Sequence, residues 1–145
     1  MNELIEEYLR SRDARYFRGH RDDEYFYIVE APNRTRLYVH LDVCGADRDA
    51  VQISIAPDRY YPAAHTDRIQ QALTRWNAEC HRVGAMLQDS SDPSLVGVAT
   101  GSRYHAGDPG EFSAFVEGSE TAAIDLFASL GGLIPPVPTN LREAG

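Results

Sequence analysis

The hydrophobic period of this chain changes several times along its length, and the order of the changes constrains the fold more than any single motif does. Apolar residues recur with helical spacing near the start, alternate from Arg15, return to helical spacing from Thr66, alternate again from Val83, and close in a long helical stripe from Phe112. Helices and runs of strands in this order predict an α+β domain with one antiparallel sheet.

The expected elements follow the order α-β-β-β-α-β-β-α, with one extra short strand near the start. Polar turns such as Pro32-Asn33 and Pro57-Asp58 separate the strands. The predicted strands are Tyr16–Arg18, Glu24–Ala31, Arg36–Cys44, Val51–Ile55, Val83–Leu87 and Leu95–Ala99. Together they would form one sheet that packs against the helices.

The alternation within the strands predicts two different sheet faces. In the strand that ends at Cys44, one set of side chains is apolar: Leu37, Val39, Leu41 and Val43. The set between them is polar or aromatic: Arg36, Tyr38, His40, Asp42 and Cys44. Because successive side chains of a strand point to opposite sides, the first set should face the helices and the second should form a polar and aromatic outer face.

Two helices anchor the predicted core. The first carries an apolar stripe made of Ile69, Leu73, Trp76 and Cys80. The second begins at the capping sequence Asp108-Pro109-Gly110-Glu111 and ends at Gly131-Gly132. We therefore expect a single α+β domain over residues 1–132, followed by a proline-containing tail over residues 133–145.

The composition excludes several classes of function. Lys+Arg number 14, all of them Arg, so a Schiff-base or P-loop lysine is absent, and the net charge of −8 disfavours a nucleic-acid partner. No apolar run is long enough for a membrane span. Only two cysteines, Cys44 and Cys80, are present, which fits free thiols in a reducing compartment. We expect a cytoplasmic protein that binds neither membrane nor nucleic acid.

The sequence contains no catalytic motif, and we predict no catalytic residues, metal or cofactor. His40 and Cys44 share a strand face but are about 13 Å apart, too far to ligate one zinc ion without a bulge. His40 beside Asp42 could transfer a proton, with the Cys44 thiol as a nucleophile. An alternative hypothesis is therefore a small enzyme or ligand binder with a pocket lined by Tyr38, His40, Asp42 and Cys44.

Tyrosine enrichment is the one sign of an association surface. Tyrosines on an open sheet face are typical of interfaces, although aromatic pairing between strands explains them equally well. Trp76 fits a core position better than an exposed one, and Asn77 lies off the apolar stripe, where it could bond a neighbouring backbone or a subunit. The candidate partner-binding or interface residues are Tyr25, Tyr27, Tyr38, His40, Trp76 and Asn77.

The Trp76-Asn77 pair, the element order and the closing helix with Phe112-x-x-Phe115 and Leu126-Phe127-x-x-Leu130 resemble the YbjN-like family of sensory-transduction regulators. This resemblance implies a fold similar to that of type III secretion chaperones, frequent dimerisation, protein partners and no established chemistry. The extra strand near Tyr16 and the proline tail depart from the family pattern. The main hypothesis is therefore a non-enzymatic, chaperone-like or regulatory module that binds a protein partner as a homodimer.

Overall fold

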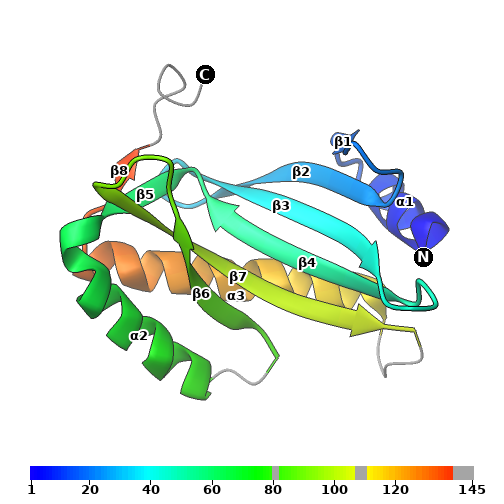
Figure 1. The fold of residues 1–145 in the computed structure, drawn as a ribbon. Helices are drawn as coiled ribbons and strands as arrows, with labels where there is room; N and C mark the ends of the chain where they lie inside the picture. Colours follow the sequence, from blue (N-terminus) through cyan, green and yellow to red (C-terminus); the bar gives the residue numbers. More distant parts are fainter. Residues whose placement is uncertain (80–81, 107–110, 139–145) are drawn as a thin grey trace.

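A computed structural model describes residues 1–79, 82–106 and 111–138 of the chain. Within these ranges it contains three α-helices, one short 3-10 helix (η1, Ala63–His65) and eight strands (Figure 1). The helices are α1 (Asn2–Ser11), α2 (Thr66–Glu79) and α3 (Phe112–Leu133). The strands are β1 (Tyr16–Arg18), β2 (Glu24–Ala31), β3 (Thr35–Cys44), β4 (Ala50–Pro57), β5 (Arg59–Pro62), β6 (Gly84–Asp89), β7 (Leu95–His105) and β8 (Val137–Pro138).

All the strand pairs described are antiparallel, and β1, β2, β3, β4 and β7 lie in that order. Both β5 and β6 pair with the start of β7, where Val96 is opposite Tyr61 of β5 and Asp89 of β6. One residue can pair with two strands only across its two edges, so β5 and β6 flank β7 on opposite sides. The short strand β8 pairs with β5.

The longest helix, α3, lies behind the sheet, while α1 lies at the β1 end and α2 lies beside β6 (Figure 1). The inward residues of β3 are buried as the alternation predicts, with Leu37 and Leu41 both at 0% exposure. They pack in one core with buried residues of α3 such as Val116 and Leu126. The antiparallel α+β fold and the extra strand at Tyr16–Arg18 are therefore confirmed.

Two short strands were not predicted. Pro57-Asp58 indicates the end of a strand, but Arg59–Pro62 resumes pairing directly after it as β5. Val137–Pro138 lies in the proline-rich segment and still pairs with β5, because two residues at a sheet edge can include a proline. The expected capping residues 108–110 and Cys80 lie outside the described residues.

Candidate association surface on the sheet

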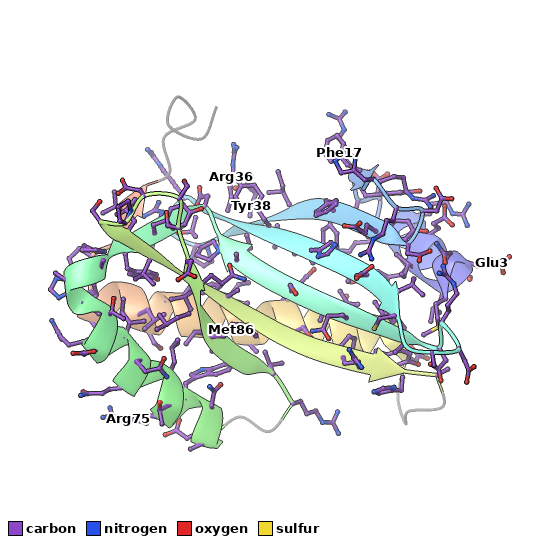
Figure 2. The ribbon with its side chains drawn as sticks, in the orientation of Figure 1. Glu3, Phe17, Arg36, Tyr38, Arg75 and Met86 are labelled. Atoms are coloured by element: carbon purple, nitrogen blue, oxygen red, sulfur yellow. The ribbon has the colours of Figure 1, made fainter. Side chains whose placement is uncertain are left out.

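Four large apolar side chains are exposed together on the outer face of β1, β2 and β3. Phe17 is 60% exposed, Phe26 38%, Ile28 47% and Tyr38 45%. The strand register places Phe17 opposite Phe26 and Ile28 opposite Tyr38. Figure 2 shows Phe17 and Tyr38 on the upper rim of the sheet, away from α3. We call Phe17, Phe26, Ile28 and Tyr38 the outer aromatic patch.

The register also corrects the expectation for two tyrosines of β2. Tyr25 and Tyr27 point to the helix-covered side, where they are 0% and 3% exposed. The central residues of this strand, Tyr25 to Ile28, are apolar or aromatic in both phases, so their alternation alone did not reveal which phase is buried. Tyr25 and Tyr27 are therefore core residues, and their neighbours Phe26 and Ile28 carry the exposed surface.

A polar network borders the patch on one side. The Phe26 ring stacks on the imidazole of His40, with ring centroids 4.5 Å apart. His40 Nε2 lies 3.1 Å from Glu24 Oε2, and Arg21 donates to Glu24 at 2.8 Å and to both oxygens of Asp42 at 3.1 Å. The hydrogen bond from Arg21 is the main reason that the pKa of Glu24 is lowered. This network gives the patch a charged border.

A second charged pair lies beyond the other end of the patch. Glu30 and Arg36 are opposite each other on β2 and β3, next to the Ile28–Tyr38 pair. Their side chains are 72% and 58% exposed, and Arg36 Nε is 3.4 Å from Glu30 Oε1. Such an exposed pair adds little to stability, but it places both signs of charge at the rim of the patch.

The residues of the alternative pocket hypothesis form a row rather than an enclosure. Tyr38, His40, Asp42 and Cys44 do share the outer face of β3. However, the six residue steps from Tyr38 to Cys44 span about 20 Å, which is too long for the row to line one small pocket. Two cavities of about 390 and 430 Å³ lie elsewhere in the described structure and are lined by other residues.

Trp76 and Asn77 hold α2 against the edge of the sheet. The Trp76 ring is partly buried against the core. The side-chain amide of Asn77 donates to the carbonyl of Ala85 at 3.0 Å, and its oxygen accepts the Ala85 N–H at 2.7 Å. Because Ala85 lies on β6, Asn77 occupies the place that an additional strand would take. Of the two bonds that the sequence left open for Asn77, the structure shows the one to a neighbouring backbone.

A buried polar cluster on the helix-covered side was missed by the sequence analysis. The Glu120 carboxylate of α3 accepts hydrogen bonds from both terminal nitrogens of Arg12, each at 2.7 Å. It also accepts a hydrogen bond from the Tyr27 hydroxyl at 2.6 Å. The side chain of Glu120 is only 7% exposed. Burial is the largest effect that raises the pKa of Tyr27, and the negative charge of Glu120 raises this pKa further. The cluster ties α3 to β2 and to the end of α1.

Neither a metal centre nor a membrane helix is found in the described ranges. No group of three or more His, Cys, Asp or Glu side chains there is placed to hold a metal ion. No helix in the same part of the chain is long and apolar enough to cross a membrane.

These features define a small α+β protein whose antiparallel sheet has one helix-covered face and one outer face with an exposed aromatic patch. The chain belongs to the YbjN family, described as "Putative bacterial sensory transduction regulator", whose sequence model matches residues 2–131. The family suggested by the Trp76-Asn77 pair and the closing helix is thereby confirmed. No curated protein matches the sequence at a significant level.

Two solved structures are similar in fold. One is the crystal structure of YbjN from E. coli, described as "a putative transcription regulator", with a TM-score of 0.67 and 12% identity over 94% of this chain and 95% of that one. The other is an uncharacterized protein from Methanothermobacter thermautotrophicus, with a TM-score of 0.55 and 11% identity over 92% of this chain and 98% of that one. At these identities the similarity shows the fold alone.

Proposed function

We propose that this chain is a non-enzymatic protein-binding module, regulatory or chaperone-like, that acts as a homodimer and associates through the outer aromatic patch. The observation that carries the proposal is the patch itself, because its four large side chains are exposed side by side. Contiguous exposed apolar surface marks interaction sites, and aromatic residues are enriched at the centres of interfaces. None of the four side chains belongs to the described hydrophobic core or packs against it.

The sheet face is a better candidate than the sheet edges. A partner that adds a strand needs an edge with unpaired backbone groups. On β6, the side chain of Asn77 already bonds both backbone groups of Ala85. At the opposite edge, β1 extends only from Tyr16 to Arg18. We therefore infer recognition by side chains of the outer face, with the patch buried against the partner.

A second copy of the same chain suits this surface. A two-fold interface brings identical patches together, so the surface must complement itself. The rim carries both signs of charge, Glu30 and Arg36 at one end and Arg21 with Glu24 at the other. Charges of both signs on one rim can be matched by a second copy of that rim. The dimer would bury the exposed apolar area and leave the helices free.

The partner is proposed to be a protein. The family description, "Putative bacterial sensory transduction regulator", suits a module that acts by association. The E. coli relative is described as "a putative transcription regulator", but this chain has a net charge of −8, which repels a phosphate backbone. A regulatory role through protein contacts, in the cytoplasm, is therefore the form that we propose.

The proposal is tested by light scattering across a dilution series. The wild-type chain is expected to have twice the monomer mass. Ile28→Glu places a charge in the patch and should weaken association by roughly a hundredfold or more, because an unpaired charge would be buried at the interface. Met86→Glu is the matched control, because Met86 is 48% exposed, but on β6 instead of β1, β2 or β3.

The outcomes separate the parts of the proposal. A wild-type monomer at every concentration would exclude the homodimer. A dimer that persists in Ile28→Glu would move the interface away from the patch. A dimer that is lost equally in Ile28→Glu and Met86→Glu would show that an added charge prevents association wherever it is placed. The outer aromatic patch would then not be identified as the interface.

A further inference from the structure

A cavity of about 390 Å³ lies on the helix-covered side, at the end of the sheet opposite α1. It is bounded by the β2–β3 turn, by β5 and by the last turns of α3, which meet at this end in Figure 1. Its apolar walls include Leu37, Ile124 and Phe127. The volume falls within the range of small-molecule sites in proteins, about 300–1,000 Å³. The cavity is separate from the outer aromatic patch.

The hydroxyl of Tyr61 is a polar group without a partner at this cavity. Tyr61 is 2% exposed and lines the cavity, and no residue of the described part of the chain hydrogen-bonds its hydroxyl. In the same part of the chain, no fully enclosed side-chain oxygen or nitrogen lacks a partner. The Tyr61 hydroxyl must therefore reach open space, and the space that Tyr61 lines is the cavity. An acceptor atom of a ligand in the cavity would satisfy this donor.

Arg59 adds a positive charge to the same cavity. Arg59 and Tyr61 are two residues apart on β5, so their side chains share a face of the strand. The Arg59 Nη2 is 3.4 and 3.5 Å from the carbonyls of Asn33 and Arg34, and its Nε is 3.7 Å from Asp58. These contacts are at or beyond the long limit for hydrogen bonds, so the guanidinium keeps donors for a stronger acceptor.

The chemistry of Tyr61 supports a donor role at this position. Burial raises the pKa of Tyr61 to about 12, against the opposing effect of the Arg59 charge. The hydroxyl therefore keeps its proton throughout the physiological range. A neutral donor next to a guanidinium suits a carboxylate, which accepts hydrogen bonds and carries the opposite charge.

The end of α3 leaves room for the rest of such a ligand. Gly131 and Gly132 both line the cavity, and a Cβ built on either would meet nothing within 4 Å. Both are helical residues with ordinary backbone angles, so larger residues are tolerated there. The absence of side chains at these positions keeps the cavity open without a requirement from the backbone.

We propose that this cavity binds a small amphiphilic carboxylate, whose head group bonds the Tyr61 hydroxyl and Arg59 and whose short apolar body packs on Leu37 and Phe127. The site goes beyond the proposed association surface and stands independently of it. This binding site for a small molecule lies on the opposite side of the sheet from the outer aromatic patch.

Isothermal titration calorimetry of the full chain with octanoate tests the site. Octanoate is expected to bind with one molecule per chain. Tyr61→Phe should weaken binding about tenfold or more, because it removes one charge-assisted hydrogen bond. Tyr60→Phe is the matched control, because it removes a hydroxyl from the next residue of β5, which does not line the cavity. This variant should bind octanoate as the wild type does.

Two further comparisons test the head group and the apolar body. Arg59→Gln should weaken octanoate about tenfold but leave 1-octanol, which has no charge, within twofold. Gly131→Leu fills space at the end of α3 and should reduce binding of both compounds. Butyrate, which keeps the carboxylate and shortens the apolar body, should bind at least tenfold more weakly than octanoate.

Several results would overturn the assignment. The first is the absence of saturable octanoate binding to the wild-type chain. The second is binding that Tyr61→Phe and Gly131→Leu leave unchanged while circular dichroism shows both variants folded. The third is an equal loss in Tyr61→Phe and Tyr60→Phe, which would place octanoate elsewhere. Because this site does not overlap the outer aromatic patch, its failure would leave the dimer proposal standing.

Discussion

Phe26 and Tyr27 are neighbours on β2, yet their side chains lie on opposite faces of the sheet. Tyr27 is 3% exposed and bonds a buried carboxylate, whereas Phe26 is 38% exposed and stacks on His40. Along β2 and β3, residues that face the helices are more buried than the residues between them, which lie on the outer face. It teaches that aromatic content alone does not identify an interface, because one strand can use its aromatic residues for the core and for an exposed surface in alternation.

The two faces also differ in the number and the hydrogen bonding of their polar side-chain atoms. On the helix-covered side, the Tyr25 hydroxyl accepts a hydrogen bond from Asn2 at 3.0 Å, and the Tyr27 hydroxyl donates to Glu120 at 2.6 Å. The outer aromatic patch is mainly Phe and Ile, with only the Tyr38 hydroxyl as a polar atom. We therefore expect substitutions on the covered face to change stability, and substitutions in the patch to change association.

The largest expected effect on stability comes from Glu120→Ala on the covered face. This change leaves the Tyr27 hydroxyl without its acceptor and leaves the Arg12 guanidinium with the Tyr8 hydroxyl in place of a carboxylate. Breaking a buried ion pair from one side costs about 3–5 kcal/mol, and we expect about 3 kcal/mol, since the Arg12 side chain keeps 29% exposure. Urea unfolding measures the loss.

Glu117→Ala is the control for this prediction. Glu117 lies on the same helix, but its side chain is exposed. Its removal should change the free energy of unfolding by no more than about 0.5 kcal/mol. If Glu120→Ala were as mild as Glu117→Ala, the buried cluster would not hold α1 and α3 to the sheet.

A smaller effect is expected at the edge of the sheet. Asn77→Ala removes both hydrogen bonds to the backbone of Ala85 and should cost about 1–2 kcal/mol. The amide of Ala85 should also exchange with solvent faster, which hydrogen exchange read by NMR can measure. Gln70→Ala, an exposed position on the same helix, should leave that exchange rate unchanged. If the Ala85 amide exchanged equally slowly in Asn77→Ala, the Asn77 side chain would not protect the backbone of β6 from solvent.

The smallest expected effect is a pH dependence at the surface. Arg48 donates to Asp23 and lowers the pKa of this carboxyl below its usual 3.8. The unfolded chain then binds the proton more tightly, so the contribution is present above the usual pKa and is lost as the pH falls below it. Between about pH 5 and pH 3, the wild type should lose slightly more stability than Asp23→Asn. Parallel slopes for the two proteins would show that the pair contributes nothing.

Much of the fold could be predicted from local pattern. The alternation from Leu37 to Val43 has one apolar phase, so it shows directly which side chains are buried. In the strand with Tyr25 and Phe26, the central residues are apolar or aromatic in both phases, and only the flanking Glu24 and Glu30 indicate the outer phase. The exposed Phe26 and Ile28 were missed for this reason, although they share the phase of the two glutamates. Phe17 lies on β1, which has only three residues and is too short to show an alternation.

The polar sites could not be predicted because they depend on contacts distant in sequence. Glu120 is separated by 108 positions from Arg12, and a charged residue in a helix normally indicates a solvent-exposed side. The cavity likewise combines Tyr61, from a strand that was not predicted, with Gly131 at the end of α3. Such sites arise from the tertiary arrangement and have no local signal.

The central claim, that the two faces of one strand have separate roles, is tested by comparing two neighbouring variants by light scattering at one concentration. Phe26→Ser is expected to have the mass of a monomer with nearly unchanged stability. Tyr27→Phe loses a hydrogen bond to a charged group, worth about 1.5–3 kcal/mol, and is expected to remain a dimer. A Phe26→Ser variant that stays dimeric while Tyr27→Phe becomes monomeric would contradict the account.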